Sequence, residues 1–71
     1  MKAKIRLDKM SDVNKFVDVC NTLEGKIVLS DGVEYTVNAR SVLGAIASLE
    51  WNELWVVSEN DIYTAIMEWV I

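Results

Sequence analysis

Histidine and proline are both absent from this chain of 71 residues, which contains only three glycines and one cysteine. Without histidine there is no imidazole to act as a general base or to bind a metal. A single cysteine cannot form a disulfide within the chain, and Cys20 lies among apolar residues, which fits a reducing environment. No apolar run approaches the roughly 18 residues of a membrane span. The first residues also lack the apolar block of a secretory signal. We therefore expect a cytoplasmic protein with no metal site and no membrane span.

The composition supports one small folded domain over residues 1–71. Hydrophobic residues make up 52% of the chain and include three tryptophans, which supply bulk for a core. The net charge is −4, so binding to a phosphate backbone would gain little from counterion release, and we expect no nucleic-acid partner. Five of the seven basic residues lie within the first fifteen positions. This cluster is interpreted as a solvated strand face in preference to a binding stripe.

The first part of the chain predicts a strand followed by a helix. Residues 2–7 alternate charged and apolar side chains, as in a half-buried strand. Ser11 is expected to cap the helix, and Asp12 lies in its first turn, where the helix dipole favours an anion. Gly25 is expected to end the helix in the left-handed conformation. The apolar stripe of this helix has steps of three and four residues: Val13, Phe16, Val17, Cys20 and Leu23.

A β-hairpin is predicted next. Its first strand contains Ile27 and Leu29, and Asp31-Gly32 is a signal for a two-residue type I′ turn. On the return strand one face is expected to be apolar and the other polar. The apolar face would carry Val33, Tyr35 and Val37, and the polar face Glu34 and Thr36.

The period becomes helical from about Ser41, with apolar residues at Val42, Leu43, Ala45, Ile46 and Leu49. Gly44 within this helix costs about 1 kcal/mol relative to alanine. Its expected use is a close approach of the helix to the sheet. Residues 54–57 predict a fourth strand. Ser58-Glu-Asn-Asp61 resembles a capping box that opens a last helix, whose inner stripe is Ile62, Ala65, Ile66 and Trp69.

The predicted element order, β-α-β-β-α-β-α, places the chain in the α+β class. A split pair of crossovers of this kind puts the helices on one face of a four-stranded antiparallel sheet. The result is an open-faced two-layer β-sandwich, whose other sheet face remains open to water.

The segment Ser41-Val-Leu-Gly-Ala-Ile46 resembles the second-helix signature of the histidine-containing phosphocarrier protein (HPr) family of the bacterial sugar phosphotransferase system. The resemblance implies an HPr-like fold. Members of that family carry a phosphoryl group on a histidine within a Gly-Ile-His-Ala-Arg-Pro type of loop. The corresponding residues 8–14 contain no histidine, arginine or proline, and no general base lies near Ser11 or Asp12. We therefore expect no phosphocarrier activity, no catalytic residues and no cofactor.

The resemblance implies two roles for the second helix. Ser41 matches a serine that a regulatory kinase phosphorylates; the alternative is that Ser41 only caps the helix. Val42, Leu43 and Ile46 match an exposed apolar patch on which several partners dock, and Trp51 follows closely. The competing interpretation is that the tryptophans, Trp51 among them, cover the core of a short domain.

The sequence thus predicts a non-enzymatic, HPr-like protein-binding or regulatory module. Two alternatives remain open. One is a phosphoacceptor regulated at Ser41. The other is a domain that forms homo-oligomers through an exposed tryptophan or an unpaired sheet edge.

Overall fold

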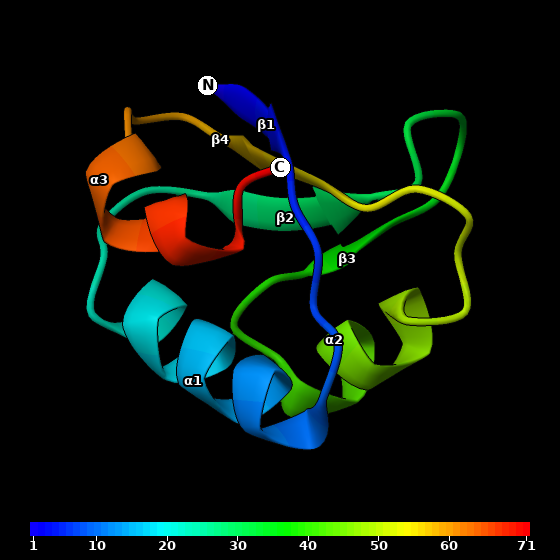
Figure 1. Cartoon of the computed structure of the whole chain (residues 1–71). Helices are drawn as coiled ribbons and strands as arrows, with labels where there is room; N and C mark the ends of the chain where they lie inside the picture. Colours follow the sequence, from blue (N-terminus) through cyan, green and yellow to red (C-terminus); the bar gives the residue numbers. More distant parts are fainter.

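A computed structural model describes residues 1–71 and shows an α+β fold with an open four-stranded antiparallel sheet. The strands are β1 (Lys2–Lys4), β2 (Ile27–Ser30), β3 (Thr36–Asn38) and β4 (Trp55–Ser58), in the spatial order β1-β4-β2-β3. The helices are α1 (Met10–Asn21), α2 (Val42–Ser48) and α3 (Tyr63–Ile66), and a 3₁₀ turn over Met67–Trp69 follows α3. Figure 1 shows α1 and α2 along one face of the sheet, with α3 beside α1. This confirms the predicted class and antiparallel sheet.

The core lies between the sheet and the helices. Ile27, Leu29 and Val56 alternate with outward-facing neighbours and are almost completely buried, as expected for strands with one covered face. The predicted stripe of α1 is confirmed from Val13 to Cys20, and Leu23 packs against its edge. The ring of Phe16 meets that of Trp69 edge to face, with centroids 5.3 Å apart.

The predicted Ser11 cap is wrong. Helix α1 begins at Met10, and Lys9 occupies the N-cap position, two residues before Ser11. The carboxylate of Asp12 instead accepts hydrogen bonds from the backbone N–H groups of Asp8 (3.2 Å) and Lys9 (3.3 Å). An acidic side chain in the first turn therefore satisfies the two amides that immediately precede the helix.

Gly25 has the expected left-handed φ of 85°, but it lies beyond the end of α1, which closes at Asn21 with Thr22 as C-cap. Arg40 reaches this end of the helix from the β3–α2 connection. Its guanidinium donates from Nε to the carbonyl of Cys20 at 3.0 Å and from Nη2 to the carbonyl of Leu23. A carbonyl of the last turn of α1 and one just beyond the helix thus meet a cation from elsewhere in the chain.

The hairpin forms, but its predicted two-residue turn is wrong. Ser30 pairs with Thr36, so the connection has five residues, 31–35. Asp31 Oδ1 accepts hydrogen bonds from the N–H groups of the three residues that follow Gly32, at 2.8, 2.9 and 3.0 Å. This carboxylate organises a wider loop, in which only Gly32 has a positive φ. Val33 and Tyr35 consequently lie in the loop, 86% and 59% exposed, and not on the inner face of a strand.

Two elements near the chain ends are shorter than predicted. The strand predicted over residues 2–7 narrows after Lys4 to a single bridge between Ile5 and Val70. Its inward side is still buried, through Ile5 and Leu7.

The predicted capping box of the last helix is wrong. Ser58 belongs to β4, and its hydroxyl donates to the carbonyl of Asn60. Helix α3 follows Ile62 as N-cap and is only four residues long. Of its predicted inner stripe, Ile62, Ile66 and Trp69 are buried, whereas Ala65 is exposed.

Candidate functional site

Helix α2 packs on the sheet through its smallest residues. A Cβ atom at Gly44 would lie 3.2 Å from the carbonyl oxygen of Asn38 and 3.3 Å from Cβ of Val37. This confirms the predicted close approach of the helix to the sheet. Ala45 and Ser48 are buried on the same side. Because only small side chains fit there, the bulky apolar residues of α2 are directed toward its other sides.

The outward side of α2 is an apolar surface, here called the α2 surface. It consists of four residues that are 40, 80, 37 and 38% exposed: Val42, Leu43, Ile46 and Leu49. No charged residue occurs between positions 41 and 49. Exposed apolar residues are common singly, but a continuous cluster is typical of an interaction surface. The structure therefore brings together the predicted Val42, Leu43 and Ile46 and adds Leu49 to them.

Ser41 is the N-cap of α2. Its Oγ accepts a hydrogen bond from the N–H of Gly44 at 3.1 Å, and the residue is partly buried. This arrangement satisfies one of the amides that a helix leaves free at its start. The capping role weighed for Ser41 is thus present in the folded chain.

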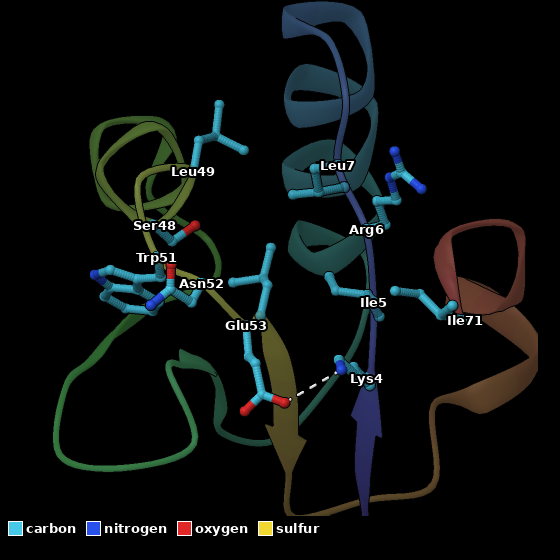
Figure 2. A pocket seen from close by; sticks show the side chains of 11 residues that line it. Lys4, Ile5, Arg6, Leu7, Ser48, Leu49, Trp51, Asn52, Glu53 and Ile71 are labelled. Atoms are coloured by element: carbon cyan, nitrogen blue, oxygen red, sulfur yellow. Dashed lines mark ion pairs between the residues drawn. The ribbon is translucent and has the colours of Figure 1, made fainter.

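Trp51 lies just past α2, packs against the core and lines a cleft of about 300 Å³. Figure 2 shows this cleft between Trp51 and Leu49 on one side and Leu7 and Ile71 on the other. Sequence reasoning did not identify the cleft, because its walls come from three distant segments of the chain. No local motif connects these segments.

The basic residues of the first strand all have partners within the chain. The Lys2 ammonium lies 4.9 Å from the centre of the Trp55 ring, and Lys4 Nζ is 3.2 Å from a carboxylate oxygen of Glu53. Arg6 Nε is 2.8 Å from Asp8 Oδ1. These contacts agree with the interpretation of the basic cluster as a solvated face. Lys4 and Arg6 also line the cleft, and each forms an ion pair with an acidic residue.

The segment between β1 and α1 has no nucleophile–base pair. Asp12 holds the backbone amides of Asp8 and Lys9, as described above. The cysteine thiol lies elsewhere, fully buried in α1, and burial raises the pKa of Cys20 to about 11 against a smaller opposite effect of Arg40. A thiol in this state is almost entirely protonated at neutral pH and is a poor nucleophile.

Comparisons with protein-family models, curated proteins and solved structures find no match to the chain. The site is therefore interpreted from its own geometry. None of the helices has the length and apolar character needed to cross a bilayer. The chain also contains no group of three or more His, Cys, Asp or Glu side chains placed to hold a metal ion.

Proposed function

We propose that this chain is an HPr-like domain without phosphocarrier activity that acts as a protein-binding or regulatory module through the α2 surface and Trp51. The element order and the segment Ser41–Ile46 support the HPr-like part of the proposal. The amides near the start of α1, held by a carboxylate of the chain itself, support the absence of phosphoryl carriage.

The observation that carries the proposal is the 80% exposure of Leu43 on an uncharged helix surface. Removing apolar area from water contributes about 25 cal/mol per Å². Because the α2 surface covers only one short helix, a partner that contacts it alone would form a small, transient interface. A partner that also enters the cleft beside Trp51 would bury more area.

The absence of phosphoryl carriage is tested by incubating the chain with the general phosphotransferase enzyme and phosphoenolpyruvate. Intact-mass spectrometry should show an unchanged mass, because no imidazole is available to accept the group. An HPr protein in the same reaction is the positive control. A stable mass increase of one phosphate on this chain would overturn this part of the proposal.

The docking role is tested with two matched substitutions. Leu43→Arg and Val33→Arg each place a cation at a highly exposed apolar position, but only Leu43 belongs to the α2 surface. A partner captured from the native cell is purified, and its dissociation constant for each variant is measured by calorimetry. We expect Leu43→Arg to weaken binding about tenfold or more, which is about 1.4 kcal/mol, and Val33→Arg to leave it unchanged. Equal affinities for both variants would refute the proposal.

The alternative function at Ser41 is favoured by one observation. The Ser41 Oγ accepts a hydrogen bond at a helix N-terminus, where a phosphate dianion is electrostatically favourable. A serine-kinase assay compares the chain with its Ser41→Ala variant. Labelling that disappears in the variant supports this alternative, and equal labelling removes it.

Self-association is the remaining alternative. The sheet edges disfavour it, because β3 has three residues and the backbone beyond β1 is bonded to residues 69–71. Light scattering over a range of protein concentrations decides: a mass that rises with concentration supports self-association, and a constant monomer mass removes it.

A further inference from the structure

The open face of the sheet contains a hollow of about 290 Å³ at the end of the β2–β3 ladder, distinct from the cleft beside Trp51. Its outer-face side chains are Lys26, Val28, Thr36 and Asn38; Val28 and Asn38 are direct cross-strand partners. Arg40 also lines the hollow. The period of two along a strand puts all four outer-face residues on the side away from α1 and α2.

The charged residues that line this hollow are both cations, Lys26 and Arg40, and neither forms an ion pair with a carboxylate. In the cleft beside Trp51, by contrast, both cations are paired with acidic groups. The carboxylate of Glu59 accepts a hydrogen bond from the Lys26 backbone N–H, and Glu59 lines an adjoining hollow. In a chain of net charge −4, two unmatched cations at one hollow mark a local site for an anion.

The polar groups of the hollow supply hydrogen-bond donors. Asn38 Oδ1 already accepts a hydrogen bond from the Arg40 N–H at 2.9 Å, which leaves the NH₂ group of Asn38 as a donor. Thr36, two residues earlier on the same face, offers a hydroxyl. Arg40 is fixed by its bonds to the carbonyls of Cys20 and Leu23, so little ordering of that cation is needed on binding.

We propose that this hollow binds a phosphate-type oxyanion, either free phosphate or the phosphoryl group of a small ester or a modified side chain. Lysine and arginine supply charge, and the threonine and asparagine supply donors from a second direction, which suits an oxyanion with several acceptor oxygens. This site lies on the sheet face opposite α2 and is independent of the proposed protein-binding function.

Titration of the ¹⁵N-labelled chain with inorganic phosphate, at constant ionic strength maintained with sodium chloride, tests the site. Saturable shifts are expected for the amides of Lys26, Thr36, Asn38 and Arg40. Lys26→Gln should weaken binding about tenfold, the loss expected for one charge-assisted hydrogen bond. Lys9→Gln is the matched control, since Lys9 is also exposed and forms no ion pair, and it should leave binding unchanged.

A second pair of variants changes charge at constant shape. Asn38→Asp keeps the acceptor for the Arg40 N–H and adds a negative charge, so it should abolish binding. Asn52→Asp adds the same charge at the other cleft and should have no effect. Lys26 is exposed and its variant is expected to fold, so the lysine pair decides the matter if Asn38→Asp does not fold.

Failure to saturate, shifts of equal size with chloride alone, or equal weakening by Lys26→Gln and Lys9→Gln would overturn the proposal. O-phosphoserine amide distinguishes the sources: tighter binding than inorganic phosphate indicates an esterified phosphoryl group, and equal binding indicates the free ion. Because the two sites lie on opposite faces of the sheet, Leu43→Arg should not alter these shifts, so the outcome is separate from that of the protein-binding test.

Discussion

Arg40 joins three parts of the chain, and its replacement by methionine should destabilise the fold strongly. The methionine keeps an unbranched apolar stem but removes the donors to the carbonyls of Cys20 and Leu23. A hydrogen bond from a charged donor contributes about 1.5–3 kcal/mol, and a cation at a helix C-terminus adds about 0.3–1 kcal/mol. Arg40 is only partly buried, so water can replace some of these contacts. We expect a net loss of about 2–3 kcal/mol.

That loss is large for a domain of this size. At about 0.05–0.15 kcal/mol per residue, a chain of 71 residues has a free energy of unfolding of about 4–11 kcal/mol. Urea unfolding followed by tryptophan fluorescence should therefore show a midpoint lower by roughly a fifth or more, with the slope m unchanged.

Lys15→Met is the control, because it removes an exposed cation whose ammonium lies 3.1 Å from Glu68. Exposed ion pairs contribute about 0–1 kcal/mol. If Arg40→Met and Lys15→Met gave the same midpoint, the claim that Arg40 stabilises the end of α1 would be refuted.

Three further predictions concern single groups. Ser41→Ala should cost about 1 kcal/mol in urea unfolding, because it removes a cap, whereas Ser11→Ala should cost much less; equal costs would contradict the capping geometry. Burial raises the pKa of Cys20 from 9.0 to about 11. The contribution of the protonated thiol to the free energy of unfolding is therefore complete below pH 9.0. It is lost as the pH rises toward 11, since the thiol of the unfolded chain ionises first. Cys20→Ala should remove this part of the alkaline destabilisation, and an unchanged pH profile would contradict it. The pKa of Asp31 is lowered by hydrogen bonds from backbone N–H groups, foremost that of Val33. The ionised carboxylate therefore adds to the free energy of unfolding at neutral pH, and this contribution is lost as the pH falls through the lowered pKa of the folded state. NMR titration of the Asp31 carboxyl checks the direction, and a pKa at or above the ordinary value would be inconsistent with the loop.

The element order could be predicted because it depends on periodicity. The alternation at Ile27 and Leu29 and the helical spacing from Val13 to Cys20 each match one buried face in the structure. The use of Gly44 could also be predicted, since a glycine within a helix has a cost that a close contact explains.

Two of the wrong predictions, the Ser11 cap and the two-residue turn, concern which side chain accepts hydrogen bonds from nearby backbone amides. Asp12 accepts hydrogen bonds from the amides of Asp8 and Lys9, and the helix starts before Ser11. Asp31 accepts hydrogen bonds from three amides of a loop that is wider than a two-residue turn. In both cases a nearby carboxylate replaced the expected local geometry. Sequence spacing alone does not rank such competitors.

The two candidate sites, the α2 surface and the hollow on the open face of the sheet, also differ in how far the sequence could predict them. Val42, Leu43 and Ile46 of the α2 surface could be predicted from the family resemblance and from a helix with more apolar residues than one face can bury, whereas Leu49 was added by the structure. The hollow on the open face could not, because it joins Lys26 to Thr36 and Asn38 through the pairing of β2 with β3. Only the pairing of those strands shows that these residues line one hollow.

The lack of charge along α2 has a consequence for how the two faces respond to ionic strength. Screening acts on exposed charges over about 10 Å at 0.1 M salt and leaves apolar contacts almost untouched. A complex on the α2 surface should therefore persist as salt is added, whereas an anion held by Lys26 and Arg40 should dissociate. A single salt titration thus separates the two faces of this small sheet without any substitution in the chain.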